Sequence, residues 1–251
     1  MTPEPRLVQH LQSSRRALVF SGAGLSTGSG IPDFRGPQGV WTRRQPVYFD
    51  EFLASEERRV EYWDQKAESF EAFRDARPNA AHEAIVALYR RGRLVGVVTQ
   101  NIDGLHQAAG LPADAVVELH GTNRRVECLE CGALSDPAPF VERFRRERRT
   151  PRCECGGLTK FATISFGQAL REESLERAFA LAGEADLVLA LGSTLSVYPA
   201  AGVPLLALRN GAPYVVINRG ETDHDHLATL RLEGDVAEIL PPAVAAIDRT
   251  D

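Results

Sequence analysis

"VFSGAGLSTGSGIPDFRG", residues 19–36, is the stretch that decides how this chain folds. An apolar run that ends in Gly22-Ala23-Gly24 predicts a buried strand and a tight turn, whose N–H groups can bind phosphate at the start of the next helix. The acidic residue that usually follows such a turn about 20 residues later is absent. The triplet Asp33-Phe34-Arg35 instead follows the turn within about ten residues. Taken alone, the segment fits a phosphate-binding turn or a plain tight turn, and the triplet also fits a surface salt bridge.

The composition is that of a soluble globular protein. The chain has 251 residues, 43% hydrophobic and 25% charged, enough for one large α/β domain with an insertion. Its net charge of -5 argues against a protein that coats nucleic acid. No segment approaches the ~20 apolar residues that span a bilayer, and the N-terminal segment lacks the apolar core of a signal peptide, so we expect a cytoplasmic protein without membrane contact. In a reducing compartment, the four cysteines favour a metal site over disulfides.

Seven apolar, β-branched segments recur along the chain without strict alternation of apolar and polar residues. Strands of this kind are buried on both faces, which indicates a mostly parallel sheet covered by helices. Helical patterns lie between them at 79–92, where Asn79 fits an N-cap, and at 172–183. The sequence therefore predicts an α/β fold with a doubly wound, Rossmann-like parallel sheet. The seven segments are 16–22, 94–101, 115–121, 162–167, 186–193, 214–220 and 230–235.

Two segments interrupt this alternation. Residues 40–77 are polar, with scattered aromatic residues and no strand pattern, and residues 121–160 are rich in arginine and contain every cysteine. We expect a helical insertion and a zinc-binding insertion, respectively, which together form a smaller lobe. The Rossmann-like domain would then consist of residues 1–39, 78–120 and 161–251.

The order of several motifs resembles that of the sirtuin family of NAD-dependent protein deacylases. The resemblance extends over nearly the whole chain and implies that NAD is a co-substrate and that acylated lysines of proteins or peptides are the substrate. It also accounts for the missing acidic residue, because in this family the loop after the glycine turn closes over NAD. The motifs are GAGLSTGSGIPDFRG (22–36), TQNIDGLHQAAG (99–110), ELHGT (118–122), the paired cysteines, GSTLSVYPA (192–200) and INRGET (217–222).

The resemblance implies a cofactor site built from the ends of several strands. Ala23, Gly24 and Thr27 would face the pyrophosphate, Gln100 would reach the ribose, and Phe34 would shield the reacting ribose from water. The residues that the resemblance assigns to NAD are Gly22, Ala23, Gly24, Thr27, Asp33, Phe34, Arg35, Gln100, Asn101, Ile102, Asp103, Gly192, Ser193, Thr194, Ser196, Asn218, Arg219, Asp235 and Val236.

Asn101 and Asp103 flank Ile102 at the end of a predicted strand, where ligands of open α/β sheets bind. Side chains two residues apart on extended backbone point the same way. The triplet alone also fits a strand-end turn, whereas the resemblance implies that Asn101 and Asp103 are catalytic and hold the nicotinamide carboxamide.

His120 ends the motif ELH, and in isolation it fits a hydrogen-bonded structural histidine. The resemblance implies that it is the general base, a role that suits an imidazole with a pKa of about 6.5. In the implied reaction, the acyl oxygen attacks the ribose carbon as nicotinamide leaves, His120 activates the ribose hydroxyls, and water releases lysine and O-acyl-ADP-ribose. We expect the remaining histidines to have other roles: His82 and His106 in packing or loop fixing, and His10, His224 and His226 in polar surroundings.

The cysteines form two pairs, Cys128-x-x-Cys131 and Cys153-x-Cys155. Four thiolates without a nearby histidine predict a closed, structural Zn²⁺ site. The second pair has only one intervening residue, which requires a sharp turn, and Gly156-Gly157 follow directly. The alternative is four unligated buried thiols.

The resemblance also implies a peptide groove and an acyl pocket. Residues 166–168 (Phe166, Gly167, Gln168) and 193–199 (including Val197 and Tyr198) match the two strands that clamp the peptide substrate in this family, and backbone pairing of this kind predicts loose sequence specificity. The desuccinylating branch carries Tyr-x-x-Arg, whereas here Trp63-Asp64-Gln65 follow Tyr62. The residues that match the walls, Phe34, Ile102, Phe166 and Val197, are apolar, so we expect good turnover of acetyl-lysine and poor turnover of succinyl-lysine.

Two questions stay open at this level. The arginine-rich segment 141–152 fits a solvated charged helix or a docking face for an acidic partner or nucleic acid. The leading function is NAD-dependent protein lysine deacetylation. Mono-ADP-ribosyl transfer, or NAD hydrolysis, is the alternative on the same fold, and a non-catalytic NAD-sensing or zinc-based module is a third reading. Intact Asn101, Asp103 and His120 favour the deacetylase.

Overall fold

A computed structural model describes residues 2–31 and 44–247 of the chain. The predicted cofactor residues Asp33, Phe34 and Arg35 lie outside the described residues. Among the helices that are described, none has the length and apolar character needed to cross a membrane.

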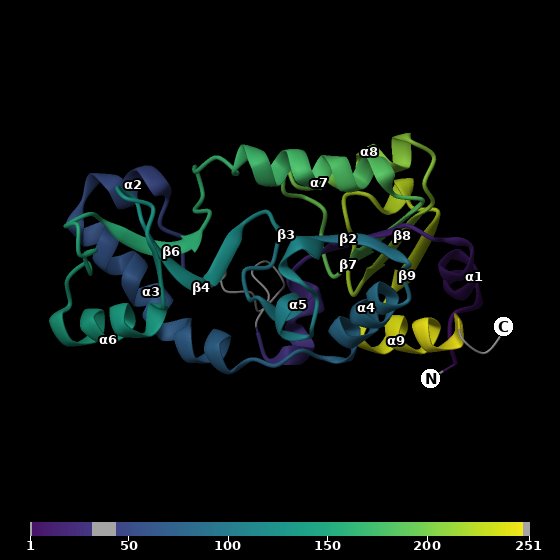
Figure 1. The fold of residues 1–251 in the computed structure, drawn as a ribbon, viewed down its shortest axis with the longest axis horizontal. Coiled ribbons are helices and arrows are strands. Elements are labelled where there is room, and N and C mark those ends of the chain that lie inside the picture. Colours follow the sequence, from purple (N-terminus) through teal and green to yellow (C-terminus); the bar gives the residue numbers. More distant parts are fainter. Residues whose placement is uncertain (1, 32–43, 248–251) are drawn as a thin grey trace.

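The larger part of the molecule is built on a parallel sheet of six strands in the order β3-β2-β1-β7-β8-β9 (Figure 1). All neighbouring strands pair in parallel. The strand order reverses between β1 and β7, which is where ligands bind in doubly wound sheets. The predicted fold class is thereby confirmed. The strands are β1 (Ala17–Ser21), β2 (Leu94–Thr99), β3 (Val116–Glu118), β7 (Leu187–Leu191), β8 (Tyr214–Asn218) and β9 (Leu230–Glu233).

Helices cover both faces of this sheet, so every residue of β1, β7 and most of β8 is buried (Figure 1). On one face lie α1 (Pro5–Ser13), α4 (Ala80–Arg90) and α9 (Val236–Ala246), and on the other α7 (Glu172–Glu184) and α8 (Gly202–Arg209). Each face has its own apolar core. The predicted cap of α4 is confirmed, because the Asn79 side chain accepts hydrogen bonds from the Ala81 and His82 amides.

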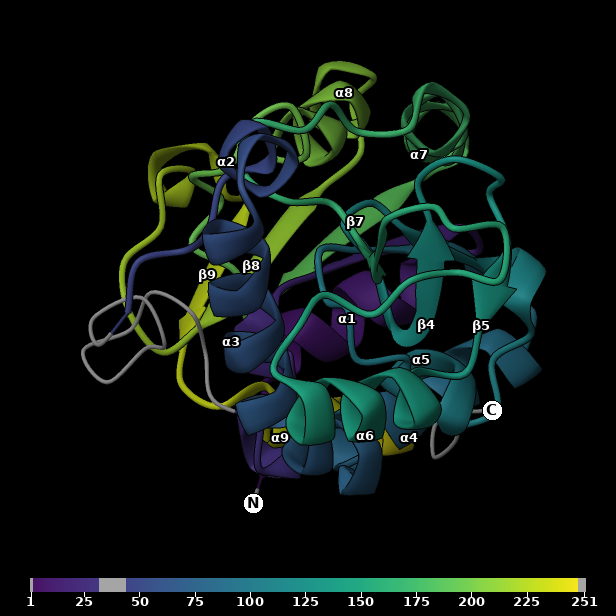
Figure 2. The same cartoon turned by 90° about the vertical axis from the view of Figure 1, so that its left-hand side faces the viewer.

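A second group of elements, here called the small lobe, lies beside the large sheet (Figures 1 and 2). Its antiparallel sheet has the order β5-β4-β6. Its core is aromatic: the fully buried Trp63 ring lies 6.1 Å from that of Phe144 and 5.5 Å from that of Phe161. The strands are β4 (Gly121–Cys128), β5 (Leu134–Ser135) and β6 (Thr159–Thr163), and the helices are α2 (Phe49–Ala54), α3 (Glu56–Asp75) and α6 (Pro137–Glu147). A further short helix, α5 (Leu105–Ala108), follows β2 in the larger part.

One predicted strand lies in a different sheet from the one expected. The apolar pattern of 162–167 predicts a strand of the parallel sheet, but β6 covers Thr159–Thr163 and pairs antiparallel with β4 in the small lobe. Its buried residues, such as Phe161, pack in the aromatic core of the small lobe. Apolar composition predicts that a strand is buried, and it does not say which sheet buries the strand.

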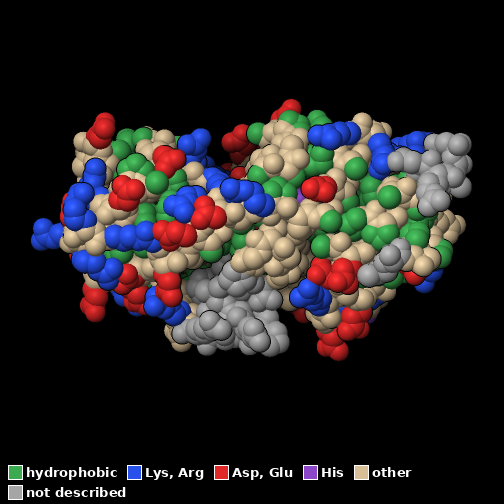
Figure 3. Space-filling view, turned by 90° about the horizontal axis from the view of Figure 1, so that it is seen from below, with side chains coloured by type: hydrophobic (Ala, Val, Ile, Leu, Met, Phe, Trp, Pro, Cys, Tyr) green, Lys and Arg blue, Asp and Glu red, His purple; other side chains and the backbone are tan. Residues whose placement is uncertain are grey.

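The arginine-rich segment begins inside α6, and its arginine side chains are exposed, three of them paired with acids. Arg145 bonds both Glu71 carboxylate oxygens, and Arg148 bonds both oxygens of Asp64, so α6 is held against α3. Acidic and basic side chains are mixed over this end of the molecule (Figure 3). These contacts favour the solvated charged helix over a docking face for an acidic partner.

The loops that follow β1 and β7 pack backbone against backbone. A Cβ atom on Gly24 would lie 2.8 Å from the Gly192 Cα, and one on Gly192 would lie 2.2 Å from the Leu25 nitrogen. The Gly24 amide donates to the Gly192 carbonyl at 2.8 Å. Gly192 also has a φ of +63°, a conformation that favours glycine.

We therefore expect Gly192→Ala to lower the free energy of unfolding by about 3 kcal/mol or more, because left-handed strain and a backbone clash add together. Gly211→Ala is the matched control, since Gly211 also has positive φ, at 90°, but no atom lies within 4 Å of the position that its Cβ would take. It should cost only about 1 kcal/mol. Urea unfolding of both variants measures the difference, and equal losses would contradict the close-packing argument.

Candidate functional site

A cavity of about 720 Å³ opens at the carboxyl ends of β1, β2, β7 and β8 and extends to the small lobe. It lies where the strand order reverses, as the fold predicts. Of the predicted residues that the structure describes, only Asp103, Ser196 and the cysteines do not line it. The predicted residues that do are Gly22, Ala23, Gly24, Thr27, Gln100, Asn101, Ile102, His120, Phe166, Gly167, Gln168, Gly192, Ser193, Thr194, Val197, Tyr198, Asn218, Arg219, Asp235 and Val236.

Ser26 joins the glycine loop to the segment after β2. The Asn101 side-chain amide donates to Ser26 Oγ at 3.1 Å, and this hydroxyl donates to Asp103 Oδ2 at 2.7 Å. Asn101 and Asp103 therefore point the same way, as predicted. The second Asp103 oxygen accepts the Leu105 amide at 2.9 Å and caps α5. Asp103 is buried and does not line the cavity, so its carboxylate reaches Asn101 only through Ser26, and its contact with the nicotinamide carboxamide stays a prediction.

Gln100 connects the same segment to the loop after β7. Its side-chain amide donates to Ser193 Oγ at 2.8 Å, and Ser193 Oγ also accepts the Leu195 amide at 3.1 Å. Thr194 and Ser196 bond each other through their hydroxyls at 2.9 Å. Side-chain hydrogen bonds thus connect the segments that follow β2 and β7, the two strands on either side of β1.

His120 lines the cavity with its ring orientation fixed. Its Nδ1 lies 3.1 Å from the Gln100 carbonyl oxygen. A carbonyl can only accept, so Nδ1 carries the hydrogen and Nε2 is the nitrogen with the lone pair. This is the tautomer that a general base requires.

Two further histidines are structural, as predicted. His106 Nε2 donates to Ser21 Oγ at 2.9 Å, since the Ser21 hydroxyl hydrogen is directed to Thr99. The rings of His82 and His106 lie 5.1 Å apart. Burial lowers the pKa of His82 to about 4 and that of His106 to about 3, so both are neutral near pH 7.

His224 differs from the expectation of a polar environment. It is 2% exposed and lies between two tyrosines, with Nε2 3.2 Å from the Tyr198 hydroxyl and Nδ1 3.0 Å from that of Tyr214. Burial lowers its pKa. His224 therefore supports Tyr198 on the rim of the cavity. Its neighbours Asp223 and Asp225 gave no sign of this burial, because the tyrosines come from elsewhere in the chain.

At the opposite end of the cavity, charged side chains lie on the loops after β8 and β9. Arg219 forms an ion pair with Asp235, and the Asn218 side chain donates to the Gly220 carbonyl at 2.9 Å. Asp235 also caps α9 by accepting the Ala237 amide at 2.8 Å. All of them line the cavity, and their contact with the adenosine end of the cofactor stays a prediction.

Neither predicted peptide-clamping segment is a strand in this structure. Residues 166–168 form a turn and 193–199 have no regular structure. The Phe166 carbonyl already accepts the Phe49 amide at 2.9 Å, which ties the segment to α2. The Thr194 carbonyl accepts the Asp223 amide at 3.0 Å in the same way, and single bonds of this kind do not make a strand ladder.

The small-lobe end of the cavity carries residues that sequence reasoning missed, among them Val47, Gln65 and Lys66. Lys66 Nζ donates to Asn123 Oδ1 at 2.9 Å and to Thr163 Oγ1 at 3.4 Å, and it lies 5.7 Å from the centre of the Tyr62 ring. Burial, and to a smaller extent nearby Lys160, lower the pKa of Lys66 to about 7. The predicted apolar residues Ile102, Phe166 and Val197 do line the cavity, and Lys66 adds a titratable amine to its wall. The Tyr-x-x-Arg pattern could not reveal a lysine one position further along α3.

Lys160 is the other lysine of the chain and is 1% exposed. Its ammonium donates to the carbonyl oxygens of Phe161, at 3.1 Å, and Thr163, and lies 3.5 Å from Gln168 Oε1. Burial lowers its pKa to about 8. Lys160 thus fixes the turn that carries Gln168.

The four cysteine sulfurs lie within 4.8 Å of one another. Cys128 and Cys155 are 3.6 Å apart, and Cys131 and Cys153 are 3.7 Å apart. A tetrahedral Zn²⁺ with bonds of about 2.3 Å requires sulfurs about 3.8 Å apart. The glycines complete the turn: Gly156 has a φ of +88°, and a Cβ on Gly157 would lie 2.7 Å from Cys128 Sγ. The cluster fits a closed, structural zinc site with all four positions taken by protein.

Known proteins similar to this chain were found by family model, by sequence and by structure. The model of the Sir2 family matches residues 22–199. NAD-dependent protein deacetylase 1 of Bradyrhizobium diazoefficiens is 45% identical over 240 residues, covering 95% of this chain and 94% of that protein. An NAD-dependent protein deacetylase of Sulfolobus acidocaldarius is 39% identical, covering 96% and 94%. A solved structure of Sir2 with a p53 peptide and NAD+ superimposes with a TM-score of 0.88 at 34% identity, covering 98% and 99%.

We expect each of Cys128, Cys131, Cys153 and Cys155, when changed to serine, to abolish stoichiometric zinc binding. The thermal midpoint should fall by about 10 °C or more, because the metal–thiolate bonds contribute folding free energy. Ala133→Ser, on the exposed turn between the ligands, is the matched control and should keep both zinc and midpoint. Metal analysis with calorimetry tests this, and a zinc-free preparation with an unchanged midpoint would contradict it.

Proposed function

The chain belongs to the Sir2 family, and from this premise we propose that it is an NAD-dependent protein lysine deacetylase that transfers the acyl group to ADP-ribose. The observation that carries the proposal is that His120 lines the cavity with its Nδ1 bonded to the Gln100 carbonyl. The substrates are proteins or peptides with acetylated lysines. A cytoplasmic location remains a prediction.

The domain division forms part of the same proposal. Residues 1–39, 78–120 and the C-terminal segment would make the NAD-binding domain, and 40–77 with 121–160 the small lobe. Because β6 pairs with β4, we place the start of the C-terminal segment after Thr163 and not at residue 161.

The residues present fit a dinucleotide. Gly22, Gly24 and Gly192 bring the loop backbones close together at the ends of β1 and β7, which leaves a shallow surface for a phosphate group. Gln100 and Ser193 offer polar atoms next to that surface, and Asn218 and Asp235 lie at its far end. When bound, NAD supplies an electrophilic ribose carbon on loss of nicotinamide.

The chain's own groups prepare this reaction. Asp103, through Ser26, orients the Asn101 side chain at the cavity wall, where it can meet a carboxamide. The Gln100 carbonyl holds His120 as a base that can accept a ribose hydroxyl proton at Nε2. Val47, Phe166 and Val197 surround the approach and exclude water, which would otherwise compete as the nucleophile.

The deciding experiment incubates the protein with NAD and a panel of acyl-lysine peptides and identifies both products by mass spectrometry. Deacylated peptide with O-acyl-ADP-ribose supports the proposal. ADP-ribosylated protein, or free ADP-ribose without loss of the acyl group, would support ADP-ribosyl transfer or NAD hydrolysis in its place.

We expect His120→Ala to lower deacetylation by about two to four orders of magnitude, the range for loss of a general base. Nicotinamide exchange should survive better, because the base acts after nicotinamide leaves, and NAD should still bind. His226→Ala, in an exposed 3-10 helix (Asp225–Leu227) outside the cavity, is the control. Isotope exchange and peptide turnover measured side by side check this, and an equal loss of both would argue against the role.

The acyl preference should depend on pH. With a pKa of about 7, Lys66 is mainly neutral at pH 8.5 and mainly protonated at pH 6. Succinyl-lysine should therefore be a poor substrate at high pH, and its kcat/KM relative to acetyl-lysine should rise about tenfold as the pH falls to 6, because a buried carboxylate gains a counter-charge. Lys66→Met should hold the ratio low at every pH. A ratio independent of pH in the wild type would contradict the prediction.

A further inference from the structure

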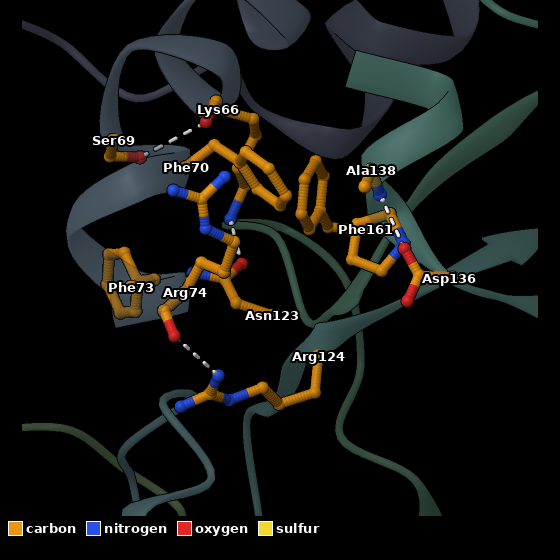
Figure 4. Close-up of a pocket in the computed structure, with 11 residues that line it drawn as sticks. Lys66, Ser69, Phe70, Phe73, Arg74, Asn123, Arg124, Asp136, Ala138 and Phe161 are labelled. Carbon is orange, nitrogen blue, oxygen red and sulfur yellow. Dashed lines mark hydrogen bonds between the residues drawn. The ribbon is translucent and has the colours of Figure 1, made fainter. Parts of the chain in front are cut away.

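A second cavity, of about 160 Å³, lies inside the small lobe between α3, the start of β4, the start of α6 and β6 (Figure 4). Lys66 is its only residue that also lines the large cavity. The other lining residues are Ser69, Phe70, Phe73, Arg74, Asn123, Arg124, Asp136, Pro137, Ala138 and Phe161.

The walls combine aromatic rings with cations. Lys66 Nζ lies 5.3 Å from the centre of the Phe161 ring, and the Arg74 guanidinium lies 5.6 Å from that of Phe70. Arg74 is paired with Asp75 outside the cavity. In the part of the chain that the structure describes, neither Lys66 nor Arg124 is within salt-bridge distance of a carboxylate.

We propose that this cavity binds a small aromatic monocarboxylate, of the size of benzoate, with its ring between the phenylalanines and its carboxylate toward Lys66 and Arg124. The volume suits one ring, since a protein cavity of about 150 Å³ holds benzene. A neutral apolar ligand would leave both cations without a counter-charge. A phosphate would leave the aromatic rings unfilled.

The cavity is connected to the catalytic segment through β4. Arg124 Nε donates to the Asp103 carbonyl at 2.7 Å, and the Asn123 amide donates to the Ile102 carbonyl at 2.7 Å. A carboxylate that fixes Arg124 also restrains the segment that carries Asn101. Bound ligand should therefore increase the affinity for NAD, and NAD should increase the affinity for the ligand by the same factor. This coupling rests on the proposed NAD site, whereas ligand binding does not.

The test uses the full chain without NAD at pH 6, where Lys66 is mainly protonated, and follows binding of 4-fluorobenzoate by ¹⁹F NMR. We expect the probe to bind the wild-type chain with a Kd of about 1 mM. Binding of the probe to Lys66→Met should be at least about tenfold weaker, because the variant removes one positive charge. Binding of 4-fluorobenzyl alcohol to the wild type should be weaker by the same factor, because the alcohol lacks the negative charge. Ala138→Phe should block the cavity and abolish binding. Ala72→Phe, on the exposed side of α3, is the matched control and should bind normally.

Binding that persists in Ala138→Phe, or displacement of the probe by an acetyl-lysine peptide, would place the probe elsewhere and overturn the site. Equal binding of benzoate and the alcohol, or displacement by millimolar inorganic phosphate, would overturn the ligand chemistry. A Kd for NAD that falls about twofold or more at saturating probe supports the coupling, and an unchanged Kd overturns it. Failure of NAD to bind at all, with the probe still bound, would count against the proposed function and not against the site.

Discussion

The structure depends on the close backbone contact between the loops that follow β1 and β7. Gly24 and Gly192 lie so near each other that neither can carry a Cβ, and this contact brings two strand ends together at the point where the sheet order reverses. Ser26 and Ser193 then lie close enough to β2 to bond Asn101 and Gln100. The orientation of His120 follows in turn, because the Gln100 carbonyl is its partner. A side chain at Gly24 or Gly192 would therefore separate the two loops and disturb each of these hydrogen bonds.

Much of this was predictable because it is encoded locally. The glycine loop, the cap at Asn79 and the spacing of Asn101 and Asp103 all act within a few residues, and the structure confirms their geometry. The sharp turn that the second cysteine pair requires was predicted from the adjacent Gly156 and Gly157. The role of Asp103 was only partly visible, since its bond to Ser26 joins residues 77 positions apart.

The features that the sequence did not reveal arise from packing between distant segments. The apolar residues of strand β6 predict that it is buried, but its pairing with β4 determines which sheet it joins. Lys66 is polar in sequence and becomes a cavity wall because α3 turns it toward Asn123 and Thr163. His224 is buried by two tyrosines, one from β8 and one from the loop after β7. In each case the environment, and not the residue type, determines the role.

The placement of the two lysines limits how readily the protein itself can be acylated. A deacetylase works among acylating agents, and most proteins of this size expose many amines to them. Here Lys160 is enclosed by carbonyl oxygens and Lys66 is half-buried in the walls of the two cavities, and the outer cations are arginines, whose guanidinium groups do not form acetyl-lysine. Among its described residues, the folded chain therefore offers at most one side-chain amine for acylation, that of the half-buried Lys66 in the wall of the large cavity.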